Sequence, residues 1–380
     1  MNIRNFKAGK YAQNYKYKSF EPELINHEWI WDDGEINVKL EKANKLLGEL
    51  NAFAYIVPDV DLFISMHIKK EATQSSKIEG TKTELDEALL PIEDISPEKR
   101  DDWQEVQNYI KAINWSIAEL DKLPLSSRLI KETHRLLLEG TRGENKTPGN
   151  FRKSQNWIGG SSPSNAVFVP PIHENLPSLL TDLEHFLNND KLTLPHLIRI
   201  AISHYQFETI HPFLDGNGRI GRLMITLYLV SNRIISKPSL YLSDYFEKNR
   251  AMYYDTLTLV REKNDLISWI RFFLKAVIST AENGVITFRK ILKLKQEYDV
   301  MISRSGRRAD DIRRVIHYLY SNPITDSNTL SEIISKDKRT ARRILNDLES
   351  RNIIRETTGN KRNRSFVLYD YLQVFLEDRS

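Results

Sequence analysis

Cysteine is absent from this chain of 380 residues. The absence excludes disulfide bonds and thiolate metal sites, and it is consistent with a reducing compartment. Long apolar runs are also missing, because the longest, LMITLYLV at 223–230, is far too short to cross a bilayer. The first twenty residues lack the apolar segment of a secretory signal peptide. We therefore predict a cytoplasmic protein without a membrane partner.

Several catalytic motifs are missing as well. The sequence contains no H-E-x-x-H, no cluster of cysteine and histidine, and no G-x-x-x-x-G-K-[ST]. Zinc-protease and P-loop chemistry therefore lack support. Three histidines in helical patterns are more typical of helix surfaces or satisfied core positions than of metal ligands: His185, His196 and His204.

Positive charge is in small excess and unevenly spread. Hydrophobic residues make up 40% and charged residues 28%, which is typical of a globular protein. The net charge is +4, but residues 301–380 carry 16 Lys and Arg against 11 Asp and Glu. A basic excess of this size is typical of a nucleic-acid-binding surface or, more often, of an ordinary solvated face.

The stretch HPFLDGNGRIGR, at 211–222, concentrates chemistry in twelve positions. Gly216 and Gly218 permit backbone conformations in which successive N–H groups converge on one anion. A helical pattern starts here, and its N-terminus would add a partial positive charge. Arg219 and Arg222 are three residues apart and can lean toward the same anion. This pattern favours a phosphate-binding site.

Two further side chains extend that interpretation. Asp215 offers hard oxygen ligands for Mg²⁺, the usual companion of a nucleotide polyphosphate. His211 is a base near neutral pH if its imidazole is unperturbed. Glycines 216, 218 and 221 also spell the dinucleotide fingerprint G-x-G-x-x-G, but residues 194–210 before it have helical periodicity instead of the required strand. A plain glycine turn between helices would not explain the base, carboxylate and two arginines.

The twelve-residue stretch resembles the Fic family signature H-x-F-x-[D/E]-G-N-G-R-x-x-R at every specified position. Fic enzymes are mostly helical and usually transfer AMP from Mg-ATP to a protein hydroxyl. Carried over residue by residue, the resemblance implies that His211 is the general base, Phe213 a buried anchor and Asp215 the metal ligand. It also implies that the two arginines contact the β- and γ-phosphates. The full set of phosphate-binding residues that it implies is Gly216, Asn217, Gly218, Arg219 and Arg222.

The segment SSKIEG, at 75–80, follows a predicted helix that starts near Asp59 or Asp61. Gly80 is in the usual position after a helix end, and a glutamate there favours a cationic partner. The segment is similar to the Fic inhibitory motif [S/T]-x-x-x-E-[G/N] at Ser75, Glu79 and Gly80. The resemblance implies that Glu79 pairs with Arg222 and inhibits the enzyme.

A long stretch from Lys146 to Pro171 interrupts the helical pattern. The turn signals Pro148-Gly149 and 159–165 precede a short β-prone segment, Val167, Phe168 and Val169 with Ala166 before them. The stretch is either a surface loop or, as it resembles, the Fic flap, an edge hairpin that holds the target segment by main-chain hydrogen bonds. Phe151 and Arg152 match the Pro-Gly-x-Phe-Arg lead-in of many relatives.

Helical periodicity covers most of the remaining chain before residue 300. We predict helices at 35–50, 59–80, 83–90, 98–120, 126–139, 174–188, 195–209, 218–231, 241–260 and 265–280. By resemblance, three residues of the 241–260 helix lie near the adenine of the nucleotide: Tyr253, Tyr254 and, as a weaker candidate, Asn249.

The last eighty residues have a different pattern. After a predicted linker at 303–306, helices at 309–321, 327–335 and 338–351 precede a β-hairpin at 353–368. Three helices and a hairpin are typical of a winged helix, a helix-turn-helix relative. Its third helix carries Lys338, Arg339, Arg342 and Arg343. DNA contact and docking of a protein partner remain equal alternatives.

We therefore predict an all-α fold with a small β-hairpin flap and a C-terminal winged helix. Its predicted domains are an N-terminal helical region at 1–100, a Fic catalytic domain at 101–300 and a winged helix at 301–380. The expected function is an autoinhibited protein adenylyltransferase that uses ATP and Mg²⁺ on Ser, Thr or Tyr of a target held along the 166–169 flap. The alternatives are a nucleotide-sensing DNA-binding regulator and a de-AMPylase that uses Glu79. The oligomeric state is open, with a homodimer as one candidate.

Overall fold

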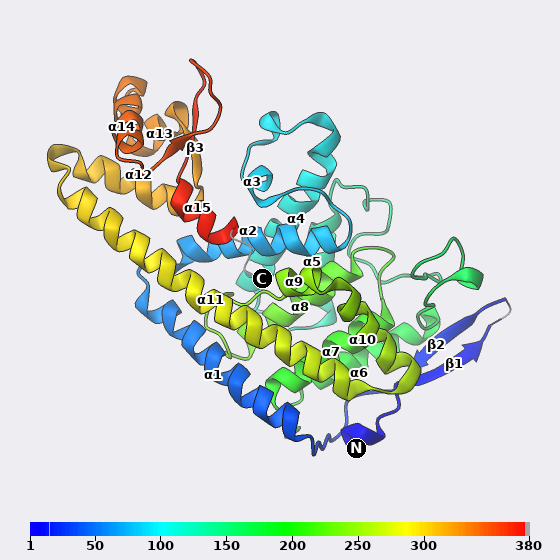
Figure 1. Cartoon of the computed structure of the whole chain (residues 1–380). Coiled ribbons are helices and arrows are strands. Elements are labelled where there is room, and N and C mark those ends of the chain that lie inside the picture. The colour runs from blue at the N-terminus through cyan, green and yellow to red at the C-terminus, as the bar shows by residue number, and fades with distance from the viewer. Residues whose placement is uncertain (15, 377–380) are drawn as a thin grey trace.

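The structure is a computed structural model that describes residues 1–14 and 16–376. Helices dominate it, and the small strands lie at its periphery (Figure 1). Buried apolar side chains form one continuous core from the N-terminal segment to the last helix. Among the residues described, no helix combines the length and apolarity that a bilayer span requires.

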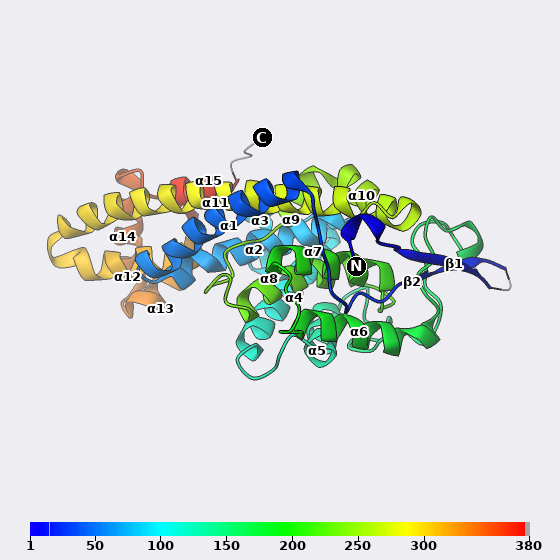
Figure 2. The same cartoon turned by 90° about the horizontal axis from the view of Figure 1, so that it is seen from below.

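Two long helices, α1 (Gly34–Ile56) and α11 (Leu266–Ser303), run side by side along one edge of the molecule (Figures 1 and 2). Asp33 caps α1 by accepting a hydrogen bond from the Ile36 N–H. Ile36, Leu40, Ala43, Leu47 and Leu50 are buried at helical spacing toward α11. The helices approach closely at Gly284, where an added Cβ would lie 2.9 Å from Leu50 Cδ1.

Helix α2 (Val60–Ile78) crosses the interior and carries the 75–80 segment at its end. It packs against α4 (Arg100–Glu119) and α9 (Ser243–Lys248) on the catalytic side and against α12 (Ala309–Ser321) on the other. Gly80 has a φ of +105°, which favours glycine and ends the helix. Helix α2 therefore contacts both the helices around the signature stretch and the C-terminal part of the chain.

A helical pair holds the signature stretch. Helix α7 (His196–Ile210) is almost entirely buried, and α8 (Asn217–Ser231) packs against it after a tight loop at 211–216. The remaining helices and strands before residue 266 surround this pair: β1 (Gly9–Gln13), β2 (Lys18–Pro22), α3 (Leu85–Ala88), α5 (Ser127–Leu138), α6 (Leu176–Asn188) and α10 (Arg250–Lys263).

The C-terminal unit, residues 309–376, contains the three helices and the hairpin predicted for the winged helix. They are α12, α13 (Ser327–Ile334), α14 (Lys338–Ser350), β4 (Arg355–Glu356) and β5 (Ser365–Val367). The structure adds β3 (Ile324–Asp326), which pairs antiparallel with β5 in the sheet order β3-β5-β4, and α15 (Tyr369–Leu376). Side-chain carboxylates of Asp326 and Asp337 cap α13 and α14.

Several predicted elements differ from those in the structure. The predicted helix at 241–260 is wrong as one helix, because α9 and α10 meet at Asn249, whose ψ of 33° interrupts the helical backbone. The helix predicted at 265–280 continues as α11 to Ser303, because its second half packs along α1. The helix predicted at 83–90 contracts to α3. The β1–β2 hairpin was not predicted, and Phe20 N of β2 donates a hydrogen bond to Val169 O of the flap segment.

Candidate active site

Two residues with left-handed backbone conformations mark the ends of the loop at 211–216. His211 ends α7 with a φ of +50°, and Gly216 precedes α8 with a φ of +75°. The Asn217 side chain joins the two ends of the loop, since its Oδ1 accepts from Phe213 N at 2.8 Å and its Nδ2 donates to Phe213 O at 2.9 Å. The Asn217 side chain therefore fixes the backbone of the loop.

Beneath the loop, Phe213 is fully buried and stacks on His134, with ring centroids 3.7 Å apart. Gly149 N donates to His134 Nδ1 at 2.9 Å, so Nε2 carries the proton and donates to Asp215 O, also at 2.9 Å. Burial lowers the pKa of His134 to about 4, which keeps the ring neutral. Phe213 is thus the buried anchor that the sequence predicted, and His134 is its unpredicted partner.

Behind His211, two side chains bind main-chain carbonyls. Arg152 Nε donates to His211 O at 3.0 Å, its NH1 donates to Ser154 O, and its NH2 donates to Pro171 O and Ile210 O. Asn156 Nδ2 also donates to His211 O, at 3.0 Å. Arg152 is only 2% exposed, and burial lowers its pKa to about 10, so it remains a cation at neutral pH. These contacts fix the backbone of the candidate base.

The His211 imidazole is arranged as a neutral base. Its Nδ1 lies 3.4 Å from Glu208 O, which assigns the proton to Nδ1 and leaves the Nε2 lone pair available. Burial lowers its pKa to about 4, although the Glu208 carbonyl and the Glu79 carboxylate act in the opposite direction. At neutral pH the ring can therefore accept a proton.

The two signature arginines are buried, and each meets a carboxylate from a distant helix. Arg219 is 4% exposed and lies 3.1 Å from Glu105 of α4, with Asp215 at 3.6 Å. Arg222 is 3% exposed and lies 2.7 Å from Glu79 at the end of α2. Both guanidinium groups are therefore neutralised within the protein.

Ser75 completes the surroundings of Arg222. Arg222 Nε donates to Ser75 Oγ at 2.9 Å, and its NH2 donates to Ser75 O at 2.8 Å. Ser75, Glu79 and Arg222, which the resemblance grouped, thus meet in space, while Gly80 ends the helix beside them. The predicted roles of these residues remain predictions.

The Glu79 carboxylate lies directly over the glycine turn. A Cβ added at Gly218 would be 2.2 Å from Glu79 Oε1. Burial raises the pKa of Glu79, but the charge and hydrogen bond of Arg222 outweigh burial, so the pKa lies below its ordinary value. A negative charge therefore occupies the space that faces the N-terminus of α8.

Glu208 is a second buried carboxyl beside the signature. Burial raises its pKa to about 7, and Arg222 only partly offsets that effect. Its Oε1 would lie 2.2 Å from a Cβ added at Gly221. Gly221, the third glycine of the stretch 211–222, therefore makes room for α7, which is a packing role and not a phosphate contact.

The predicted adenine and flap residues differ in accessibility. Tyr253 is 1% exposed, and its hydroxyl pairs with His204 Nε2 at 2.8 Å, whereas Tyr254 is 41% exposed with its ring 5.0 Å from that of Tyr253. In the flap, Val167 is 81% exposed, while Phe168 and Val169 are buried. The predicted flap hairpin is reduced to a single antiparallel bridge between Ile158 and Phe168.

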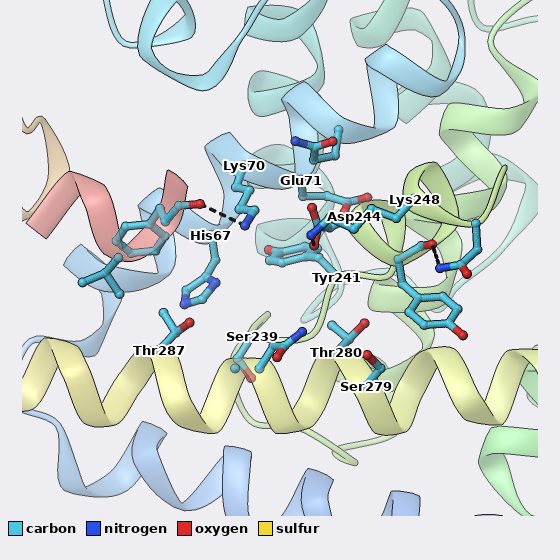
Figure 3. Close-up of a pocket in the computed structure, with 17 residues that line it drawn as sticks. His67, Lys70, Glu71, Ser239, Tyr241, Asp244, Lys248, Ser279, Thr280 and Thr287 are labelled. Atoms are coloured by element: carbon cyan, nitrogen blue, oxygen red, sulfur yellow. Dashed lines mark hydrogen bonds and ion pairs between the residues drawn. The ribbon is translucent and has the colours of Figure 1, made fainter. Parts of the chain in front are cut away.

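Asn249 lies at the junction of α9 and α10, where its carbonyl accepts a hydrogen bond from Tyr253 N at 2.9 Å. It lines a cavity of about 340 Å³ between α2, α9, α11 and α15, which Figure 3 shows in close-up. Glu71 of α2 lines it too, where burial raises its pKa to about 7 despite hydrogen bonds to Ser243 and Tyr109. None of the described residues 211–222 lines this cavity.

Sequence reasoning missed the residues that support the loop from a distance. Glu105, His134, Asn156 and Glu208 contact the signature but carry no local motif. Arg152 did carry a signal, since it belongs to the Pro-Gly-x-Phe-Arg lead-in that we assigned only to the flap. The lead-in could have identified it as a site residue.

The site therefore combines a neutral histidine, a glycine turn at a helix N-terminus, an acidic side chain and two buried arginines. That combination defines an anion-binding site with a base beside it. Comparison with known proteins agrees, because a model described as "Fic/DOC family" matches residues 124–229 and one described as "Fic/DOC family N-terminal" matches 37–118. The chain therefore contains a Fic domain at 124–229, preceded by a Fic N-terminal region at 37–118.

Relatives and solved structures extend the comparison. The chain is 32% identical over 164 residues to the protein adenylyltransferase Fic of Drosophila grimshawi and, equally, of Drosophila virilis. Each match covers 43% of this chain but only 30% of the relative's length. A Fic family protein from Desulfovibrio desulfuricans superposes over 88% of this chain and 96% of its own, with a TM-score of 0.56 at 20% identity.

A second structure, a Fic domain-containing signaling protein from Bacteroides thetaiotaomicron, covers 67% of this chain and 97% of its own. Its TM-score is 0.52 at 19% identity. At these identities the two structures share the fold with this chain. The all-α fold class predicted from the sequence is confirmed.

Proposed function

We propose that this protein is an autoinhibited protein adenylyltransferase. It transfers AMP from ATP to a Ser, Thr or Tyr hydroxyl of a target protein and releases pyrophosphate. The proposal rests on one observation above all: His211, the glycine turn and both arginines converge at the N-terminus of α8. Relatives named protein adenylyltransferase Fic share about a third of the aligned residues, which is consistent with this chemistry.

His211 acts as the general base. Its Nε2 accepts the proton of the target hydroxyl while the hydroxyl oxygen forms a bond to the α-phosphorus. The bond between the α-phosphorus and its bridging oxygen breaks, and pyrophosphate leaves with the electron pair. The lowered pKa of about 4 keeps the imidazole unprotonated at physiological pH, which is the form that this step requires.

The phosphates bind at the start of α8. N–H groups of the turn around Gly216 and Gly218 and the positive end of the helix favour the anion. Arg219 and Arg222 lie on the same helix and would stabilise the charge that builds on the phosphate oxygens. Because these donors are already positioned, little reorganisation is needed during transfer.

Asp215 is the residue that would hold Mg²⁺. Mg²⁺ in nucleotide sites usually takes one or two carboxylates, with phosphates and water as its other ligands. Asp215 fits that role, because its side chain is 43% exposed beside the phosphate loop. When bound, the ion would neutralise charge on the phosphates.

The target would bind along the flap. Val167 projects into solvent there, and a main-chain contact of this kind reads backbone more than side chains. The β1–β2 hairpin lies against the same segment through the bond from Phe20 N to Val169 O. We therefore include this hairpin in the proposed target-binding edge.

Glu79 restrains the reaction. Its carboxylate places negative charge where a nucleotide phosphate would lie, and it engages Arg222 at 2.7 Å. An exposed ion pair contributes only about 0–1 kcal/mol, but the guanidinium side of this pair is buried and less screened. Arg222 cannot fully serve both Glu79 and a phosphate, so release of Glu79 activates the enzyme.

Transfer of radiolabelled AMP to proteins of a cell lysate, or to the enzyme itself, tests the proposal. Wild type should label weakly, and Glu79→Gly should label substantially faster. Adding His211→Ala to Glu79→Gly should lower the rate by about 10²–10⁴. Undiminished labelling by that double variant, with the fold intact by circular dichroism, would refute His211 as the base.

Hydrolytic removal of AMP from a modified protein is a second candidate because Glu79 lies close enough to His211 to raise its pKa. A carboxylate in that position could orient a water molecule toward the phosphorus of an AMP-modified target. Release of AMP from a pre-modified protein by wild type, and not by Glu79→Gly, would support de-AMPylation. No release would leave transfer as the activity of this site.

A further inference from the structure

One face of the C-terminal unit carries cations that the active site does not use. Exposed basic side chains follow one another along α14 and onto the loop between β4 and β5, which we call the wing: Lys338, Arg339, Arg342, Arg343, Lys361 and Arg362. None of these six makes an ion pair within residues 1–14 and 16–376. Lysines and arginines so placed are available to an external anion.

Many other cations of the same unit are paired. Lys336 binds Asp311, Arg351 lies 3.0 Å from Asp347, and Arg364 lies 2.8 Å from Glu349. Carboxylates near α14 are therefore already engaged by residues beside the exposed face. Asp337, at the start of α14, uses its carboxylate to cap the helix through the N–H groups of Arg339 and Thr340. Within the described part of this unit, the Lys and Arg residues without an ion-pair partner are these six and Arg314 of α12, so most of the unpaired charge lies on α14 and the wing.

The unit attaches to the rest of the protein by other elements. Its α12 and α15 pack on α2, where Tyr320 contacts Phe63 with ring centroids 4.9 Å apart. Lys69 and Lys70 of α2 donate to the carbonyls of Ser321 and Phe375. Figure 1 shows α14 and the wing at the far tip of the molecule, away from this junction. The basic face therefore points to solvent.

We propose that α14 and the wing form a binding surface for duplex DNA. The second helix of a helix-turn-helix pair enters the major groove, and here that helix, α14, follows α13 after a short turn. Its exposed cations at 338, 339, 342 and 343 lie on one face, since positions four apart on a helix are neighbours. The wing would place Lys361 and Arg362 on the adjacent phosphate backbone.

The shape of the surface favours a duplex over an acidic protein segment. A helix that projects with basic residues on its solvent face, flanked by a basic loop, fits a groove and its two phosphate rows. Exposed arginines also bind acidic peptides, but a peptide lacks the two phosphate rows that α14 and the wing would contact together. The described part of α14 exposes only polar side chains on this face. This function would be separate from AMP transfer.

The full-length protein should bind a fluorescently labelled, mixed-sequence DNA duplex of about 20 base pairs, measured by anisotropy. If all six cations contact phosphates, log affinity should fall with log salt with a slope of about −5. The double variant Arg342→Gln with Arg343→Gln should reduce that slope by about 2 and weaken binding about tenfold or more at low salt.

A second adjacent pair provides a matched control. Arg313 and Arg314 on α12 are also exposed, but they line the groove between α12 and α2. The double variant Arg313→Gln with Arg314→Gln changes the net charge equally and should leave DNA affinity within about twofold. Both doubles should retain the AMP-transfer rate of the parent.

Three results would overturn the proposal. The first is no binding of the duplex by the full-length protein at about 50 mM salt. The second is an equal loss of affinity in the α12 and α14 doubles, which would indicate attraction by net charge alone. The third is displacement of the duplex by poly-glutamate at equal charge concentration, which would indicate an acidic protein partner.

Discussion

The same residue, arginine, has opposite surroundings at the two ends of this molecule. In the active site Arg222 is 3% exposed, and Glu79 and Ser75 hold its guanidinium. On α14, Arg343 is exposed, and it has no ion-pair partner among the residues that the structure describes. A ligand must displace an internal partner to reach the first, whereas only water and salt ions compete for the second.

This difference separates two ways of using positive charge. A buried, paired arginine is costly to disturb, so its pairing can control access to a site. An exposed, unpaired arginine costs little to change, and its contribution to binding depends on salt. The predictions below set buried positions against exposed ones.

The largest effect should come from Arg152, a buried arginine that binds only carbonyls of the loop and the flap. Arg152→Met would leave Pro171 O and Ile210 O short of donors, while His211 O would keep the hydrogen bond from Asn156 Nδ2. Each buried unsatisfied carbonyl costs about 1–3 kcal/mol, so the free energy of unfolding should fall by roughly 2 kcal/mol or more. Urea denaturation measures this change.

The exposed counterpart is Arg343→Met, which removes the same group from α14 and should change stability by no more than about 0.5 kcal/mol. Equal losses in the two variants would break the distinction between buried and exposed arginines. Unchanged stability in Arg152→Met would show that the loop does not depend on this guanidinium.

A smaller effect should follow from alanine at a glycine of the signature. In Gly221→Ala the new Cβ would lie 2.2 Å from Glu208 Oε1 and 3.2 Å from Phe207 Cδ1, so the buried Glu208 side chain must shift. Overpacking of this kind typically costs about 1–3 kcal/mol. The matched variant Gly48→Ala, on α1, meets nothing within 4 Å and should stabilise the protein by up to about 1 kcal/mol. Thermal unfolding of both variants shows whether each substitution raises or lowers the stability of the protein.

The smallest expected effect is on the pH dependence of AMP transfer. Burial lowers the pKa of His211 to about 4, so the unprotonated base persists well below the ordinary histidine value. AMP transfer by Glu79→Gly should therefore stay level from pH 7 to about 5 and fall only near the lowered pKa, provided that the fold persists. The charge of Glu79 raises the His211 pKa, so wild type should lose activity at a higher pH than Glu79→Gly. A midpoint near 6.5 in both proteins would contradict a buried base.

The signature and the C-terminal helices were predictable because their information is local. Residues 211–222 carry the base, the turn and both arginines within one loop and the first helical turns after it. Helix α12 matches its predicted bounds, and α13 and α14 end within one residue of theirs. Capping residues and turn residues mark those ends in the sequence.

The rest depended on contacts between distant segments. The second half of α11 packs on α1 through Phe288 and on α12 through Tyr298, and neither partner is adjacent in the sequence. Glu105 and His134 reach the signature from 114 and 81 residues away. The β1–β2 hairpin has little apolar alternation and rests on the flap. No local pattern specifies such contacts.

Affinity for ATP tests the central claim, that Glu79 and a nucleotide phosphate compete for Arg222. Isothermal titration of Mg-ATP into wild type, Glu79→Gly, and Glu79→Gly with Arg222→Ala compares the three states directly. Affinity should rise by about tenfold or more in Glu79→Gly, since removal of a like charge next to the phosphates is worth at least about 1.4 kcal/mol, and it should return toward the wild-type value in the double variant. Equal affinities in wild type and Glu79→Gly, with both proteins folded, would contradict the account.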